Sequence, residues 1–158
     1  MESEHPKHQR VAAYGVLTRQ SSLLLTRLAP HVAFQGWTLP GGGVEHGEDP
    51  RDALRREMYE EAGLQTEIGP VLDVHSTHFT GARPDGLVED YHGLHLIFAA
   101  TLLPESVGVE PSVVEVGGST DLAAWVELDE VGDLSLTGVV HHVLRILGHE
   151  SVSGGATK

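Results

Sequence analysis

Three glutamates lie close together near the middle of the chain, at positions 57, 60 and 61. In a helix that turns about 100° per residue, Glu57, Glu60 and Glu61 fall within an arc of about 100° on one face. Crowded carboxylates repel one another unless a cation lies between them, and oxygen ligands of this kind are the ones that Mg²⁺ prefers. The pattern therefore predicts a magnesium site. Bound Mg²⁺ can neutralise a diphosphate and acidify a water for attack on phosphorus.

The helix that must carry these acids has clear signals at both ends. Asp49 is suited to the N-cap, and Pro50 fits the first helical position, where a missing N–H costs nothing. Gly63 is suited to a left-handed C-terminal cap. An apolar stripe beside the acids, able to pack against a sheet, is formed by Leu54, Met58 and Ala62. Three glycines at 41–43 precede the helix and suit a backbone that approaches a ligand closely.

Residues 42–64, GGVEHGEDPRDALRREMYEEAGL, resemble the 23-residue box of the Nudix hydrolases (MutT-like), G-x5-E-x7-R-E-U-x-E-E-x-G-U with U a bulky aliphatic residue. The fixed positions are all filled, by Gly42, Glu48, Arg56, Glu57, Glu60, Glu61 and Gly63. The U positions hold Met58 and Leu64. The flanking GWTLPGG and AWVELDEV are similar to Nudix flanks as well.

The resemblance implies a role for each matching residue. Glu57, Glu60 and Glu61 are expected to bind Mg²⁺, with Mn²⁺ as a possible substitute, and Glu57 or a neighbour to position or deprotonate the attacking water. The backbone carbonyl of Gly42 is expected to be a further ligand. Glu48 and Arg56 are expected to orient the glutamates from behind.

Many Nudix enzymes use another acid from outside the box. The candidates here are Glu89, Asp90, Glu115 and Asp121, and we favour Asp121. Among the few cations, Arg27, Arg19 and Arg83 could grip a phosphate, and Arg27 is the residue that we name for substrate binding. The eleven histidines are interpreted as surface or packing residues, since pairs at i, i+3 such as His75 and His78 face opposite sides of a strand.

The rest of the chain predicts an α/β fold. Strands are expected at 11–18, 22–28, 37–40, 67–79, 90–102 and 122–128, and a second amphipathic helix at 136–147. Two helices that cover opposite faces of mixed strands predict a three-layer α/β/α sandwich with a mixed central sheet, as the Nudix resemblance also implies. We expect a flexible N-terminus at 1–9, a Nudix domain at 10–149 and a flexible tail at 150–158.

The amino-acid composition limits the classes of molecule that the protein is expected to bind. The net charge of −13 disfavours nucleic-acid polymers and anionic membranes, whose binding needs basic residues. The chain has no cysteine, no apolar run long enough to span a membrane and no apolar secretion signal, so a cytoplasmic protein is expected. The expected partner is a small nucleotide. A homodimer is compatible with the resemblance, since many Nudix proteins are dimers.

The box indicates which bond is cleaved, but it does not indicate which group is linked to the nucleoside diphosphate. The resemblance implies cleavage of the diphosphate bond of a nucleoside diphosphate linked to another group, in a nucleoside triphosphate, a nucleotide sugar or a dinucleotide. The alternative is a Nudix-fold nucleotide sensor or binding module without turnover.

Overall fold

The computed structural model describes residues 4–32 and 34–149 of the chain. Its strands are β1 (Lys7–Val16), β2 (Thr18–Arg19), β3 (Ser22–Leu28), β4 (Trp37–Thr38), β5 (Gly41–Gly43), β6 (Thr66–Ala82), β7 (Val88–Leu102) and β8 (Thr120–Glu127). Its helices are α1 (Pro50–Ala62), α2 (Leu128–Val131) and α3 (Gly138–Ile146), with a 3₁₀ turn, η1, at Pro104–Ser106.

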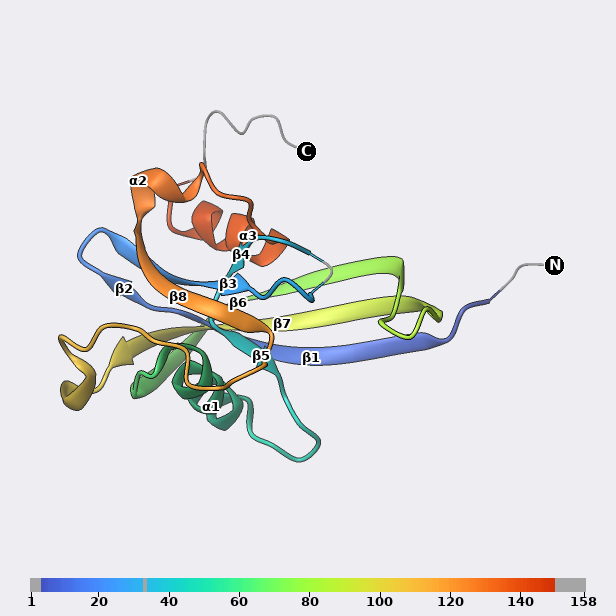
Figure 1. Cartoon of the computed structure of the whole chain (residues 1–158), viewed down its shortest axis with the longest axis horizontal. Coiled ribbons are helices and arrows are strands. Elements are labelled where there is room, and N and C mark those ends of the chain that lie inside the picture. Colours follow the sequence, from blue (N-terminus) through green and yellow to red (C-terminus); the bar gives the residue numbers. More distant parts are fainter. Residues whose placement is uncertain (1–3, 33, 150–158) are drawn as a thin grey trace.

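The strands form two sheets between the helices. One sheet has the order β5-β1-β7-β6, with β1 and β7 parallel and the other pairs antiparallel. The other sheet has the order β2-β3-β4, with β8 also paired to β3. Helix α1 lies on one side of this central layer and α3 on the other (Figure 1). The predicted three-layer α/β/α sandwich is confirmed, with a mixed sheet in a central layer that holds two sheets.

Strands buried on both faces divide the core into two clusters. Leu24 packs in the cluster with the apolar stripe of α1, whereas its neighbours Leu23 and Leu25 pack in the cluster with α3. Phe98 and Ile97 divide in the same way on β7. Successive side chains of a strand point to opposite faces, so a wholly apolar strand can serve both helices at once.

Helix α1 begins and ends where its capping residues predict. The Arg51 N–H donates to the Asp49 carboxylate at 2.8 Å, and Gly63 adopts the left-handed conformation with φ 69°. The N–H of Gly63 donates to the Tyr59 carbonyl at 2.8 Å. Between these ends, Met58 is fully buried, whereas Glu57 and Glu60 line a pocket.

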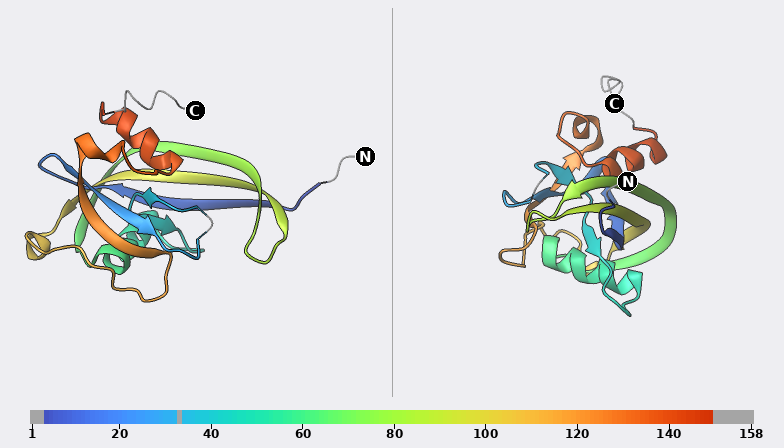
Figure 2. Two further views of the ribbon diagram at one scale, coloured as in Figure 1. Left: turned by 45° about the horizontal axis from the view of Figure 1, so that its top comes forward. Right: turned by 90° about the vertical axis from the view of Figure 1, so that its right-hand side faces the viewer.

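The distal parts of β1, β6 and β7 extend past both helices as an arm, formed by residues 7–10, 76–82 and 88–93 (Figures 1 and 2). Residues 7–9, expected to be flexible, therefore lie in a strand, paired in parallel register with residues 90–92. Residues 7–10 are exposed, so this segment carries no apolar alternation that predicts a strand. The expected flexible tail at 150–158 lies outside the described residues. No helix in residues 4–32 or 34–149 has the length and apolarity needed to cross a membrane.

Candidate active site

The acidic face of α1 lines a pocket of about 360 Å³ beside β5. Glu57 and Glu60 project into it from the helix, and Arg56 lies between them. The Arg56 guanidinium is 3.7 Å from a Glu57 oxygen and 3.6 Å from a Glu60 oxygen. One arginine thus faces two carboxylates that are both largely shielded from solvent, with 15% and 30% of their side chains exposed. The pocket therefore carries more negative than positive charge.

Glu48 holds Arg56 in place from behind. The Arg56 Nε donates to Glu48 Oε2 at 3.1 Å and its Nη2 donates to Glu48 Oε1 at 3.0 Å, a two-pronged contact. The hydrogen bonds from Arg56 lower the pKa of Glu48. The Glu45 N–H also donates to Glu48, at 3.0 Å, so the loop before α1 is tied to the same arginine. This geometry supports the positioning roles expected for Glu48 and Arg56.

The glycines of β5 provide room for the charged side chains. A Cβ on Gly42 would lie 2.1 Å from Glu57 Oε2, and one on Gly41 would lie 2.1 Å from the Ala13 carbonyl oxygen. Gly41 also has φ 142°, a conformation that side chains other than glycine rarely adopt. Any side chain at Gly42 would displace the Glu57 carboxylate, so this position of the box has a steric reason in the structure.

Glu61 lies deeper than the other two acids. It is only 6% exposed, and its oxygens accept hydrogen bonds from the Gly41 N–H and the Thr120 hydroxyl, each at 2.9 Å. Burial raises the pKa of Glu61 to about 8, and the charge of Glu57 contributes to the increase. Burial also raises the pKa of Glu57 to about 7, with a further contribution from the neighbouring Glu60 carboxylate. Both acids therefore resist ionisation in the metal-free protein.

The structure brings Glu115 to the cluster, whereas Asp121 lies elsewhere. The segment before β8 docks on the C-terminal carbonyls of α1: the Val114 and Glu115 N–H groups donate to the Glu60 carbonyl at 2.9 and 3.0 Å. This places the Glu115 side chain in the wall of the pocket with Glu57 and Glu60. Its negative charge also raises the pKa of both Glu57 and Glu61.

Asp121, the acid favoured from the sequence, forms an ion pair with Arg27, the expected substrate-binding residue. The Arg27 Nε donates to Asp121 Oδ1 at 2.8 Å, and neither residue lines the acidic pocket. The reason is strand alternation in β8: Thr120 faces Glu61, so the next residue faces away. The other two candidate arginines also lie outside the pocket, since Arg19 stacks on the Trp125 ring and Arg83 pairs with an aspartate in its own turn.

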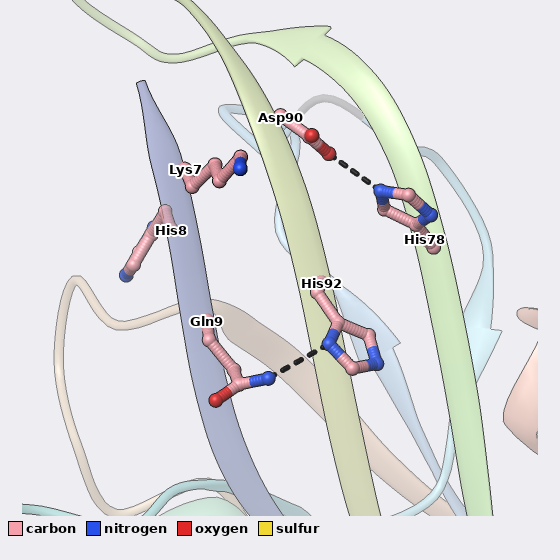
Figure 3. A pocket seen from close by; sticks show the side chains of 6 residues that line it. All are labelled: Lys7, His8, Gln9, His78, Asp90 and His92. Atoms are coloured by element: carbon pink, nitrogen blue, oxygen red, sulfur yellow. Dashed lines mark hydrogen bonds and ion pairs between the residues drawn. The ribbon is translucent and has the colours of Figure 1, made fainter. Parts of the chain in front are cut away.

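A larger hollow, of about 660 Å³, lies on the arm (Figure 3). Its polar groups already bind one another: His78 Nε2 is 2.6 Å from Asp90 Oδ1, and Gln9 Nε2 is 2.9 Å from His92 Nδ1. The dashed lines in Figure 3 mark both contacts. Size alone would favour this hollow, but the acidic pocket has the unbalanced charge and the buried acids, and we take it as the candidate active site.

The chemistry of the acidic pocket fits a hard divalent cation. Glu57, Glu60 and Glu115 line the pocket, Glu61 is buried in the same helix, and the pKa values of Glu57 and Glu61 are about 7 and about 8. Within the described residues, however, no group of three or more His, Asp or Glu side chains is arranged to hold a metal ion as it stands. The buried Glu61 oxygens are turned toward Gly41 and Thr120. Binding an ion therefore requires some of these carboxylates to turn.

Comparison with known proteins identifies the family. A sequence model of the NUDIX domain matches residues 6–146. The nucleoside triphosphatase NudI of Escherichia coli O139:H28 is 30% identical over 145 residues, which cover 89% of this chain and 97% of that protein. The crystal structure of a MutT NUDIX hydrolase from Burkholderia pseudomallei is similar, with a TM-score of 0.69, 25% identity and coverage of 87% of this chain and 97% of that one. A MutT protein from Methanosarcina mazei Go1 shares the fold, with a TM-score of 0.66 and 17% identity over 94% of this chain and 98% of that one.

The fold is a three-layer α/β/α sandwich whose acidic pocket lies beside α1. The chain belongs to the Nudix family and is a Nudix hydrolase, as the box at 42–64 predicts. Two residues of the pocket region are missing from the expectations drawn from the sequence. Arg10 lines the pocket, and Thr120 donates to Glu61. No local sequence signal predicts the role of Thr120. Arg10 has an indirect signal, because its guanidinium occupies the space that a side chain at Gly43 would fill.

Proposed function

We propose that this enzyme uses Mg²⁺, or Mn²⁺ in its place, to cleave the diphosphate bond of a nucleoside diphosphate linked to another group, with nucleoside triphosphates as the preferred substrates. The observation that carries the proposal is the cluster of acids Glu57, Glu60, Glu61 and Glu115, whose negative charge the arginines of the pocket do not balance. NudI, the relative at 30% identity, is named as a nucleoside triphosphatase, which favours triphosphates over nucleotide sugars and dinucleotides. The net charge of −13 supports a small nucleotide rather than a nucleic-acid polymer as the partner.

The residues that would hold the metal are Glu57, Glu60 and Glu61, with the carbonyl of Gly42. When bound, a divalent cation neutralises the diphosphate and lowers the pKa of a coordinated water. Glu57 or a neighbouring acid would position or deprotonate the attacking water. Glu115 supplies the acid from outside the box and adds negative charge to the pocket without being fixed in the helix.

Several residues of the chain act by positioning these acids. Arg56 contacts both Glu57 and Glu60 while Glu48 fixes the guanidinium, so both acids have a charged partner before substrate arrives. Thr120 and the Gly41 N–H fix the buried carboxylate of Glu61. These contacts keep the acids close to the place where an ion would bind, so only a turn of some carboxylates is needed.

The test is a hydrolysis screen with purified protein in Mg²⁺ and, separately, Mn²⁺. The panel contains nucleoside triphosphates, nucleotide sugars, dinucleotides and coenzyme A, and released phosphate and pyrophosphate are measured. We expect turnover of one or more nucleoside triphosphates that EDTA abolishes. Absence of product across the whole panel, together with thermal stabilisation by a nucleotide, would instead identify a sensor that binds without turnover.

A homodimer and a cytoplasmic location stay predictions. Size-exclusion chromatography with light scattering tests the homodimer.

A further inference from the structure

Arg10 is the cation of the acidic pocket that no carboxylate holds. Four glutamates and two arginines line the pocket: Glu45, Glu57, Glu60, Glu115, Arg10 and Arg56. Arg56 is occupied by Glu48, by its neighbours on α1 and by the Gly43 carbonyl. Arg10 forms no ion pair and no side-chain hydrogen bond with any residue in the part of the chain that the structure describes. In a protein with ten basic residues against twenty-three acidic ones, an unpaired guanidinium beside acids is unusual.

The position of Arg10 is built into the fold. Ala12 pairs with Gly43 across β1 and β5, and Arg10, two residues earlier, projects from the same face of β1. A Cβ on Gly43 would lie 2.4 Å from Arg10 Nη2 and 2.9 Å from Cζ. The guanidinium therefore lies directly on the Gly43 backbone, in space that any other residue at this position would fill.

The two neighbouring glycines thus serve opposite charges. Gly42 leaves room for the Glu57 carboxylate on the α1 side of β5, and Gly43 leaves room for the Arg10 guanidinium on the other side. Since alternate residues of a strand face opposite ways, the short strand β5 separates the acids from the free cation by the width of one backbone. A polyphosphate at the edge of β5 is therefore within reach of both.

The geometry points to Arg10 as a substrate-binding residue that grips a phosphate of the polyphosphate chain. Arginine presents donors in a planar fork that matches two phosphate oxygens, and the contact with Gly43 limits the freedom that the side chain loses on binding. Arg27, the arginine expected from the sequence, is held by Asp121 instead. This inference rests on the proposed function, because it assumes that the acidic pocket takes a phosphorylated substrate.

The test measures binding without turnover as well as kinetics. Variants Arg10→Gln and Arg10→Lys are compared with Arg55→Gln, a matched control on the exposed side of α1 whose guanidinium pairs with Asp52. Calorimetry with imidodiphosphate and Mg²⁺ gives the affinity for a diphosphate that resists hydrolysis, and electron paramagnetic resonance gives Mn²⁺ affinity in the absence of phosphate. KM and kcat are measured with the best nucleotide from the screen. Thermal melting confirms that each variant is folded.

We expect Arg10→Gln to weaken imidodiphosphate binding and to raise KM, each by at least about tenfold, because a charged two-pronged hydrogen bond is lost. The kcat should change by less than about threefold. Mn²⁺ affinity should be unchanged or tighter, since removing a positive charge near the acids favours a cation. Arg10→Lys should recover part of the loss, and Arg55→Gln should match the wild type.

Two results would overturn the inference. One is an Arg10→Gln protein whose imidodiphosphate affinity and KM stay within about twofold of the wild type. The other is a loss of Mn²⁺ affinity as large as the loss of imidodiphosphate affinity, which would show that Arg10 supports the acids rather than the substrate. Failure of the proposed function has a different signature. Wild-type protein would then release no product from any nucleotide, while the imidodiphosphate titrations would still report on Arg10.

Discussion

Two clusters of titratable groups lie on opposite sides of the central layer, and burial acts on them in opposite ways. The acid cluster beside α1 consists of Glu57, Glu60, Glu61 and Glu115. The histidine cluster lies where β6 and β7 face α3 and consists of His75, His95 and His142. Burial is the largest cause of the raised pKa values of Glu57 and Glu61 and of the lowered pKa values of His75 and His95, because it disfavours the charged form.

The rings of the histidine cluster find their hydrogen-bond partners within the protein. His75 Nδ1 lies 3.1 Å from His95 Nδ1, so one ring donates and the other accepts, which requires at least one neutral imidazole. Burial lowers the pKa of His95 to about 4, and the charges of His75 and Arg10 contribute. The remaining ring, His142, binds Asp73 at 2.8 Å. Neutral histidines thus satisfy one another inside the protein.

The acid cluster can do this only while some of its members are protonated, because ionised carboxylates only accept hydrogen bonds. The charges of its members raise the pKa values of Glu57 and Glu61, and the arginine beside them, Arg56, is shared with Glu48. The difference separates a packing cluster from a functional one. Shifted pKa values occur in both, but only the acid cluster keeps a charge imbalance that a ligand must correct. Four predictions test this distinction.

The largest effect is expected on catalysis. Glu57→Gln and Glu61→Gln should each lower kcat by at least about a hundredfold, because a lost metal ligand removes stabilisation of the transition state. His142→Gln, in the histidine cluster, should leave kcat within about twofold of the wild type. Steady-state kinetics with the best nucleotide from the screen measures both. Wild-type rates in the two glutamine variants would mean that the acid cluster is not the catalytic centre.

A smaller catalytic loss should follow from a single methyl group. Gly42→Ala places a Cβ 2.1 Å from Glu57 Oε2, so the carboxylate must move away from its position. We expect kcat to fall about tenfold, since small displacements of a catalytic group are costly. The matched control is Gly138→Ala beside the histidine cluster, where the new Cβ would lie 3.7 Å from His75 Cε1, an ordinary contact. Equal kcat values for the two alanine variants would contradict this account of Gly42.

The third prediction concerns stability. In metal-free protein the pKa values of Glu57 and Glu61 are raised from 4.5 to about 7 and about 8, so the folded state holds more protons than the unfolded state in this window. The free energy of unfolding should therefore fall as pH rises from about 4.5 to about 8. Mg²⁺ at a hundredfold excess over its Kd should raise Tm by about 5 to 10 °C at pH 8, and by less at pH 5.

Thermal melting in EDTA and in Mg²⁺ across this pH range measures the effect. Glu67→Gln, on the exposed side of β6, is the matched control for Glu61→Gln and should keep the full response to Mg²⁺. A metal-induced rise in Tm that is as large at pH 5 as at pH 8 would count against titration of these acids. Loss of the response in the Glu67 variant would place the metal elsewhere.

The sequence predicts α1 well because its determinants are local. Asp49, Pro50 and Gly63 mark the helix ends, and the spacing of the glutamates fixes their common face. The acid from outside the box is not predictable in this way. Glu115 reaches the pocket through backbone hydrogen bonds to the end of α1, and backbone N–H groups leave no mark in the sequence.

The histidines show a second limit. Their i, i+3 spacing correctly places His75 and His78 on opposite faces of β6, since His75 contacts His95 and His78 contacts Asp90 and His92. The cross-strand partners themselves depend on register. The register of β6 against β7 shifts between Ile68 and Val71 and again before Asp73. The residues of β7 that lie opposite each histidine of β6 therefore cannot be found by counting residues in the sequence.

The smallest effect is expected in the histidine cluster, with the opposite sign to that of the acids. The folded-state pKa of His95 is about 4, below its ordinary 6.5, so the unfolded state binds more protons between these values. Stability from this residue is therefore present above pH 6.5 and is lost as pH falls toward 4. His95→Gln removes the titration while keeping a side chain that can bind His75. Because the acid cluster titrates in both proteins, the difference in Tm between wild type and variant isolates the histidine.

Between pH 6.5 and pH 5, the Tm of the wild type should fall by about 2 to 4 °C more than the Tm of His95→Gln. The value is modest because His95 is only partly buried. Protonation would place a second positive charge near Arg10 and break the hydrogen bond with His75, whose other neighbours are His142 and, through their charges, Asp73 and Arg145. Wild-type and His95→Gln melting temperatures that run parallel across this range would show that His95 carries its charge freely in the folded state. In that case the contrast between a self-satisfied histidine cluster and an unbalanced acid cluster would not hold.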